Sequence, residues 1–338
     1  MVRWIVPFLL VISPTPSPGA APPDRLDQAI ARGLRRLETG AAAYVQNRQC
    51  FSCHHQTLTI ASLLQARHRG FAIDGDLLQD QVRFTRDSFQ DRKDSIRKGE
   101  NVGGRSTTAA YALHTLQLGG HPADEMTNAL VQYLVVRQEI DGSWPAQMPR
   151  VPSEGSKFTN ATLALAAFRH YASIDPTRNP EVARAYQKGS AWLLEARPES
   201  TEDRVFHLRG LVDLQAPRER IEKALRELAS QQLPDGAWRQ IPLREGDAYA
   251  TATVLLALRH AGIDRANAVY RRGIGYLLRT QTAEGAWIVT TRNRPIQRWF
   301  DNGDPGGKHQ FISFLATGWA TLALLDACPP RSGESPDG

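Results

Sequence analysis

Cysteine is scarce in this chain, which has three cysteines in 338 residues. That excludes a disulfide-rich secreted scaffold, because such folds depend on many paired cysteines. The chain also lacks a run of lysine or arginine, so its formal charge of +6 indicates a solvated surface of mixed charge and predicts no nucleic-acid partner. Outside the N-terminus we identify no apolar run long enough to cross a bilayer, and we predict no stable membrane span.

The N-terminus has the layout of an export signal. Arg3 precedes an apolar run from Trp4 to Ile12, and the small and proline residues of SPTPSPGAAPP follow. A basic start, a short apolar stretch and small residues near a cleavage point are typical of signal peptides. We predict a signal peptide at 1–21, cleaved near Gly19 or Ala21, and a periplasmic or secreted protein.

Three short segments of the chain resemble one another. They read QEIDGSW at 138–144, QLPDGAW at 232–238 and QTAEGAW at 281–287. Their tryptophans are separated by about 50 residues or about twice that distance, which is typical of helical hairpins stacked in series. The step from an acidic residue to Gly predicts a turn, because Gly can take a positive φ.

Two kinds of helix alternate around these segments, and strand signals are almost absent. Small, apolar, threonine-rich stretches such as 247–262 predict buried inner helices, whereas charged amphipathic stretches such as 265–281 predict outer helices with one wet face. We predict outer helices near 25–46, 75–91, 123–137, 181–196, 218–231 and 265–280. We predict inner helices near 55–69, 105–118, 157–171, 203–214, 247–261 and 310–326.

Six hairpins of this kind can close into a ring. Closure removes the exposed ends that an open solenoid has to cap. We therefore predict an all-α fold, an (α/α)6 toroid of six outer and six inner helices. Residues 22–328 would form this single domain, and residues 329–338 a disordered tail.

The repeated segments carry a family resemblance. The Gln-x-x-acidic-Gly-x-Trp pattern resembles the QW repeats of squalene-hopene cyclases and related terpene cyclases. The paired helices are similar to the toroid shared with protein prenyltransferase β subunits, and the resemblance extends over most of residues 25–327. It implies that the repeated side chains tie adjacent hairpins together, which gives a structural role to Gln138, Trp144, Gln232, Trp238, Gln281 and Trp287.

The residues that carry cyclase chemistry in these families do not match here. A class II cyclase protonates an alkene with the central acid of a DxDD motif, and the most similar stretch starts at Asp247 but has Tyr249 at the central position. A tyrosine is too weak an acid for that step. The chain also has no Asp-Asp pair for class I magnesium binding and no match to the prenyltransferase zinc set. We therefore expect no active class I or class II cyclase. We interpret Asp247 as a helix cap, with substrate contact by Asp247 or Tyr249 left open.

The stretch Cys50-Phe51-Ser52-Cys53-His54 is the attachment signal of c-type haem. Both thiols would bond to haem vinyl groups and His54 would ligate the iron, outside the cytoplasm, in agreement with the predicted export. No recognisable cytochrome domain surrounds the motif. The alternatives are zinc held by Cys50, Cys53 and His54 or His55, and a disulfide between the two cysteines.

The repeat gives this motif a place in the ring. Aligning the terminal glycines Gly70 and Gly262 puts it in the loop that enters the first inner helix, at the mouth of the toroid cavity. Ring closure then predicts that His309 approaches the motif, as the second iron ligand or the fourth zinc ligand. Arg105 and Lys157, at the starts of other inner helices, are candidates for pairing with haem propionates.

These features predict an exported toroid with covalent haem c at the cavity mouth. It would act in electron transfer with a redox partner protein, or in redox chemistry on a small or apolar ligand in the cavity. The alternative is a degenerate terpene cyclase-like enzyme or lipid-binding protein in which the CxxCHH site holds zinc or a disulfide. A third class is a non-catalytic interaction scaffold, so the sequence leaves open whether the protein is an enzyme.

Overall fold

The computed structural model describes residues 23–146, 150–293 and 301–329. This described part is built from helices, and it contains no β-strand beyond one isolated bridge between Trp238 and Asp247. The predicted signal peptide at 1–21 and almost all of the predicted tail at 329–338 lie outside the described residues.

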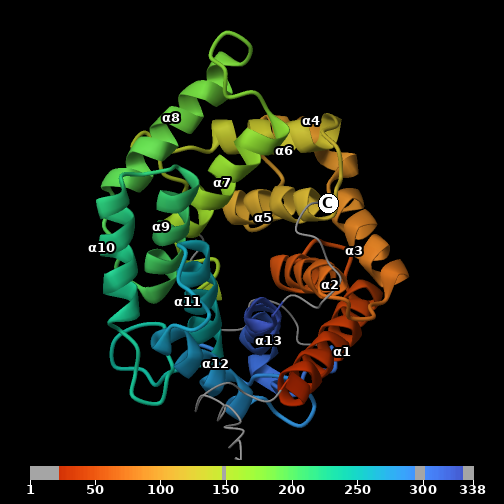
Figure 1. Ribbon diagram of the computed structural model, residues 1–338. Helices are drawn as coiled ribbons and strands as arrows, with labels where there is room; N and C mark the ends of the chain where they lie inside the picture. Colours follow the sequence, from red (N-terminus) through yellow and green to blue (C-terminus); the bar gives the residue numbers. More distant parts are fainter. Residues whose placement is uncertain (1–22, 147–149, 294–300, 330–338) are drawn as a thin grey trace, which may run out of the picture.

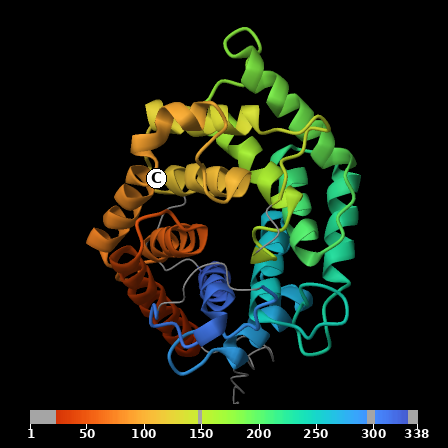
Figure 2. The same ribbon diagram turned by 180° about the vertical axis from the view of Figure 1, so that it is seen from behind.

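The helices form two concentric layers around a common centre (Figure 1), and the view from behind shows the same ring (Figure 2). The outer layer consists of α1 (Pro23–Asn47), α3 (Gly75–Asp87), α6 (Glu125–Val136), α8 (Pro180–Glu195), α10 (Arg218–Ala229) and α12 (Ala268–Thr280). The inner layer consists of α2 (Leu58–His68), α5 (Arg105–Leu118), α7 (Lys157–Tyr171), α9 (Thr201–Asp213), α11 (Ala248–His260) and α13 (Gln310–Ala327). The predicted all-α toroid is therefore confirmed.

Four short helical segments were not predicted. They are the π-helix η1 (Cys53–Thr57), the 3-10 helices η2 (Gln90–Arg92) and η4 (Gly307–His309), and the short helix α4 (Lys93–Arg97). The first of these corrects the placement of the cysteine–histidine motif. Its second half lies within the start of the first inner helix and not in the loop before it, because Ser52 is the N-cap.

The inner helices are buried on almost every side because their side chains are small and apolar. In α11 nearly every side chain from Ala248 to Leu258 is buried, whereas α10 buries only Leu228. Several threonines of the inner helices remain compatible with burial because their hydroxyls bond the carbonyl one turn earlier. Thr253, for example, donates to the carbonyl of Tyr249 at 2.9 Å.

The Gln–Trp segments join neighbouring hairpins, as the resemblance implied. Each tryptophan is buried, and its indole N–H donates to a carbonyl of the preceding outer helix: Trp144 to Leu134 (2.7 Å), Trp238 to Leu228 and Trp287 to Leu277 (both 2.8 Å). Each glutamine amide donates forward to the next outer helix: Gln138 to Ala185 and Gln232 to Val269 (both 2.8 Å), and Gln281 to Ala29 (2.9 Å).

The last of these bonds closes the ring. Gln281 follows α12, and Ala29 lies in α1, so the C-terminal outer helix is fastened to the N-terminal one. On the inner layer, α13 packs against both α1 and α2. Arg69 at the end of α2 also donates to the carbonyl of Cys328 at 3.1 Å. Contacts between the two ends of the chain thus define the toroid.

One helical stretch, Gly307–Ala327, is long and apolar enough to cross a membrane by length and composition. This corrects the expectation that no such stretch follows the N-terminus. The stretch comprises η4 and α13, and 72% of its apolar window is buried inside the structure. Its apolar character is that of a core helix enclosed by α1, α2 and α11.

Candidate functional site

The cysteine–histidine segment begins the first inner helix. Ser52 caps η1, and its hydroxyl accepts the backbone N–H of His55 at 3.4 Å. Cys50 is exposed and Cys53 is buried, and neither forms a disulfide within the described residues. His54 and His55 are both buried, so this motif is part of the core at the point where the ring closes.

A chain of hydrogen bonds fixes the tautomer of His55 and places the Ser52 hydroxyl beside His54. The Asn302 oxygen accepts the backbone N–H of Asp304 (2.9 Å), so its amide nitrogen donates to His55 Nε2 (2.8 Å). His55 then carries its proton on Nδ1, which lies 3.3 Å from the Ser52 hydroxyl oxygen. The Ser52 hydroxyl oxygen also lies 2.8 Å from Nδ1 and 3.2 Å from Nε2 of His54, so it contacts both nitrogens of that ring.

Both imidazoles are neutral and enclosed by rings. Burial lowers the pKa of His55 to about 3 and lowers the pKa of His54 well below its ordinary value. His55 stacks on Tyr44 with ring centroids 4.3 Å apart and lies 4.4 Å from Phe314. The ring of Phe311 meets that of His54 edge-on at 4.6 Å. The segment is therefore held by helices from both ends of the chain.

The other predicted ligands lie elsewhere. The region of α12 and α13 approaches the motif, as ring closure required. Among the described residues, however, the contacts come from Asn302 and the phenylalanines of α13 and not from His309. His309 Nδ1 instead accepts the backbone N–H of Thr291 at 3.2 Å. Lys157 is half exposed and lies 3.9 Å from Asp141 in the first Gln–Trp segment. Arg105 is exposed and lines an outer pocket.

His54, as placed here, does not fit a metal or a haem iron. An imidazole ligates through a nitrogen without a proton that faces the ligand position. In His54 both ring nitrogens lie within hydrogen-bond distance of the Ser52 hydroxyl oxygen, at 2.8 and 3.2 Å, so neither faces a separate ligand position. Across the described residues, no three histidine, cysteine, aspartate or glutamate side chains gather as a metal-binding group.

A second group of buried polar side chains lies on the inner segments of the ring, and we call it the central cluster. All its members are buried, and they come from the inner segments of five of the six hairpins: Cys53, Tyr111, Thr159, Glu202 and Tyr249. Burial first, and then the charges of Glu202, Tyr111 and Cys53, raise the pKa of Tyr249. Tyr249 and Cys53 belong to inner segments separated by α13 in the ring.

Glu202 is the acid of this cluster. It lies in the first turn of α9 with 3% of its surface exposed. Tyr249 of α11 donates to its Oε2 (3.0 Å), and Thr159 of α7 donates to its Oε1 (3.1 Å). Burial raises the pKa of Glu202 to about 7 against the lowering effect of these two bonds. The carboxyl group is therefore poised to gain or lose a proton near neutral pH.

Asp247 has the capping role predicted for it. Its Oδ1 accepts the backbone N–H of Ala250 at 2.9 Å, and its Oδ2 accepts the side-chain amide of Gln240 at 2.9 Å. Burial raises its pKa to about 6. Tyr249 has a different role, because at the place of the missing cyclase acid it hydrogen-bonds the acid of the neighbouring inner helix.

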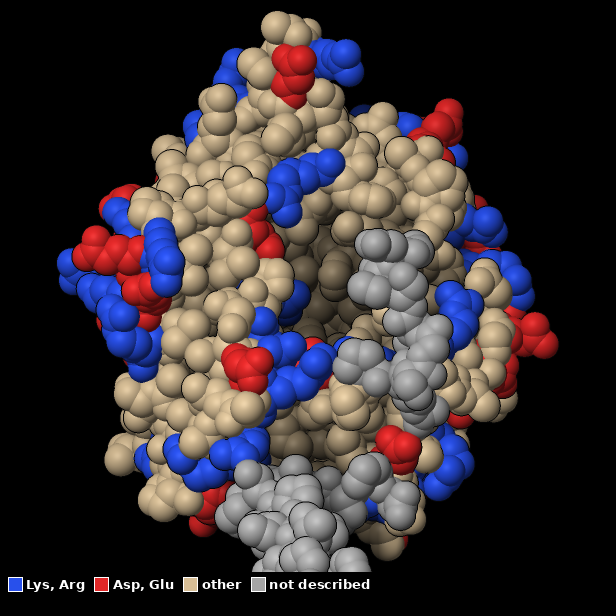
Figure 3. Space-filling view, in the orientation of Figure 1, with Lys and Arg blue, Asp and Glu red and all other residues tan. Residues whose placement is uncertain are grey.

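Long loops of the ring meet near the cysteine–histidine segment. Arg150, in the loop before α7, lies 5.4 Å above the Phe311 ring and 3.3 Å from Glu154. Its charge helps to keep His54 and His55 neutral. The backbone of Val151 exchanges two hydrogen bonds with the Asn293 side chain, at 2.9 and 3.0 Å. The space-filling view shows a hollow at the centre of the ring with basic side chains along its edge (Figure 3).

Sequence reasoning did not identify Glu202. Its neighbour Asp203 forms a capping box with Ser200. The Ser200 hydroxyl accepts the backbone N–H of Asp203 at 3.1 Å, and the Asp203 carboxylate accepts the backbone N–H of Ser200 at 3.0 Å. Acidic residues in the first turn are typical of ordinary helix starts, so Glu202 carried no signal of its own. Asn302, Arg150 and Phe311 were missed because their contacts connect segments that are far apart in the sequence.

Comparison with known proteins agrees with this geometry at the level of fold. The type II terpene cyclase MstE from Scytonema superposes with a TM-score of 0.56 at 14% identity, over 90% of this chain and 99% of the cyclase. A candidate member of the GH105 family from Klebsiella pneumoniae superposes with a TM-score of 0.54 at 13% identity, over 96% and 98% of the two chains. The chain therefore has the α/α-toroid fold that these two proteins share.

The sequence comparison is more specific for the C-terminal half. Residues 190–336 match the family model of the squalene-hopene cyclase C-terminal domain. This range holds two of the three Gln–Trp segments and the helices α9 and α11 that carry Glu202 and Tyr249. No curated protein sequence matches the chain.

Proposed function

We propose that the protein is a general acid–base catalyst that transfers a proton to or from a small ligand inside the toroid. The observation that carries this proposal is the Tyr249–Glu202 pair, a carboxyl group buried where three inner helices meet, with its pKa raised to about 7. Proton transfer by a side chain is most effective when its pKa lies near the working pH. Glu202 would exchange the proton, and Tyr249 and Thr159 would hold its carboxyl group in place.

The pKa of Glu202 also limits the chemistry. A carboxyl group that titrates near neutral pH is too weak an acid for an unactivated alkene. We therefore propose transfer at an oxygen atom or at a carbon next to a carbonyl group, and not the alkene protonation of class II cyclases. The ligand would be small and largely apolar, with one polar group directed at the central cluster. The fold relative MstE is described with geranylgeranyl dihydroxybenzoate as substrate, a molecule of this mixed character.

Deuterium exchange tests the proposal. The protein is incubated in D2O with a panel of isoprenoid ketones, alcohols and prenylated hydroxybenzoates, and products are analysed by mass spectrometry. Glu202→Gln should reduce deuterium incorporation about 100-fold or more, because it removes the exchangeable proton. The matched control is Glu219→Gln, which makes the same change on the exposed start of α10. Equal rates for Glu202→Gln and wild type, or no exchange on any panel member, would contradict the proposal.

Covalent haem c through Cys50 and Cys53 is a second proposal. It is supported by the motif, by the absence of a disulfide at either thiol in the described residues, and by the exposure of Cys50. It requires His54 to turn away from Ser52 and Phe311, as does the zinc alternative in which His54 is the ligand.

Expression in a periplasm with haem-maturation machinery tests this second proposal. The denatured protein should give a pyridine haemochrome spectrum that Cys53→Ala abolishes and Cys328→Ala keeps. A colourless protein with stoichiometric zinc would favour the zinc alternative, and neither group would reject both. Mass analysis of the exported chain tests the predicted cleavage near Gly19 or Ala21.

A further inference from the structure

The connection between α3 and α5 departs from the repeat. In three other hairpins a Gln–Trp segment follows the outer helix, but here the chain forms η2 and α4 and then the loop KGENVGGR at 98–105. The segment α4 packs against α6 of the next hairpin. This connection is about as long as those that carry the Gln–Trp segments, so it differs from them in structure and not in size.

A pocket of about 400 Å³ opens between this loop and the end of α6. Three arginines line it: Arg92 from η2, Arg105 from the start of α5, and Arg137 from the end of α6. Glu100 is the one acidic residue among the residues that line it. None of the three arginines forms an ion pair with a described residue. The pocket therefore has three positive charges against one negative charge.

The guanidinium groups are positioned by contacts that leave their charge intact. Arg92 donates to the carbonyls of Asn101 and Ser88 and lies 5.8 Å from the centre of the Phe89 ring. Arg137 lies 5.9 Å from the centre of the Tyr133 ring, which also lines the pocket. Stacking on an aromatic face orients a guanidinium without pairing it with an anion.

Two residues at the pocket have left-handed backbone conformations. Asn101 and Arg105 both take positive φ, at 57° and 52°. A left-handed conformation costs a side chain such as arginine about 1 kcal/mol or more. Here it brings Arg105 to the pocket at the point where α5 begins.

We infer that this pocket binds a compact phosphate-type oxyanion. Arginine recognises phosphate oxygens through paired N–H donors. Three guanidiniums around one small, open pocket match an anion with more than one charge. Arg105, which the sequence suggested as a partner of haem propionates, would then serve a site separate from the central cluster. The anion could be a free phosphate or diphosphate, or the phosphate group of a lipid.

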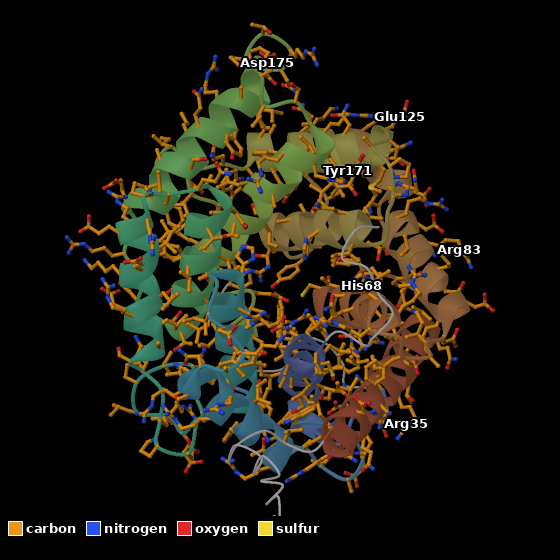
Figure 4. All side chains as sticks on the ribbon, viewed as in Figure 1. Arg35, His68, Arg83, Glu125, Tyr171 and Asp175 are labelled. Atoms are coloured by element: carbon orange, nitrogen blue, oxygen red, sulfur yellow. The ribbon has the colours of Figure 1, made fainter. Side chains whose placement is uncertain are left out.

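Calorimetric titration of the full chain with inorganic phosphate and pyrophosphate tests the inference. Vesicles of phosphatidylcholine with and without phosphatidic acid form a second arm. Arg105→Gln and Arg137→Gln should each weaken anion binding roughly tenfold, because each removes a charge-assisted hydrogen-bond donor. The matched control is Arg83→Gln on the outer face of α3, at the periphery of the ring (Figure 4). Circular dichroism verifies that each variant is folded.

Each outcome of these titrations either supports or overturns the proposed anion site. Pyrophosphate binding that weakens in the two pocket variants but not in Arg83→Gln supports a free-anion site. Binding only to phosphatidic acid vesicles, with the same pattern among the variants, supports a lipid phosphate as the source. No binding in either arm, or equal binding by Arg105→Gln, Arg137→Gln and Arg83→Gln, overturns the inference.

Discussion

Gly285 lies where the last Gln–Trp segment meets the first helix of the ring, and Gly285→Ala should strongly destabilise the fold. Its φ is +87°, and a Cβ atom there would lie 2.4 Å from the backbone oxygen of Arg32, whereas ordinary contacts begin at 3.4 Å. The left-handed conformation alone costs an alanine about 1 kcal/mol. Moving the Arg32 carbonyl would also disturb the bonds of Gln281 to Ala29 (2.9 Å) and to Gly285 (3.2 Å). At about 1 kcal/mol for each bond, the total is about 3 kcal/mol.

Gly262→Ala provides the matched control. Gly262 has a φ of +90°, and its added Cβ would meet nothing within 4 Å, so this variant reports backbone strain alone. Urea unfolding followed by circular dichroism should give a loss of about 1 kcal/mol for Gly262→Ala and about 3 kcal/mol for Gly285→Ala. Equal losses in the two variants would refute the close approach of the last segment to α1, and with it the proposed closure of the ring.

Three further predictions concern the central cluster and the repeat. Because the folded pKa of Glu202 lies above the ordinary 4.5, the folded state binds more protons than the unfolded state between pH 4.5 and 7. Stability should therefore fall by about 3 kcal/mol as pH rises across this range, and Glu202→Gln should flatten that part of the profile in urea titrations. Tyr249→Phe removes a bond to the charged form, so the pKa of Glu202 should rise further in carbon-13 NMR titrations, and a fall would contradict the assigned contact. Trp238→Phe leaves the Leu228 carbonyl without its indole donor and should lower the free energy of unfolding by about 1 to 3 kcal/mol; an unchanged midpoint would show that the bond does not stabilise the fold.

The helices were predictable because their signal is local. The apolar period of 3.6 residues marks the outer helices, and the small apolar stretches mark the inner ones, so twelve predicted helices appear within a few residues of their places. The structure of the connection between α3 and α5 escaped prediction for the same reason. Its short segments η2 and α4 are too brief to show a period, and α4 buries only Ile96.

The two candidate sites differ in how much of each could be predicted from the sequence. The cysteine–histidine segment stood out because its residues are adjacent, but its environment was not predictable. Asn302 and Phe311 contact it across more than half of the chain. Glu202 gave no signal, since it acquires its raised pKa only when α7, α9 and α11 meet.

By itself the sequence determined the repeat and the alternation of amphipathic outer helices with buried inner helices. These depend on periodicity, spacing and residue type, which are properties of short stretches. The tertiary structure alone decided what the titratable groups can do. Burial and hydrogen bonding from other hairpins give Glu202 a pKa near neutrality and hold His54 against Ser52. Solvation and electrostatics depend on neighbours in space, and closing the ring is what makes residues from both ends of the chain neighbours.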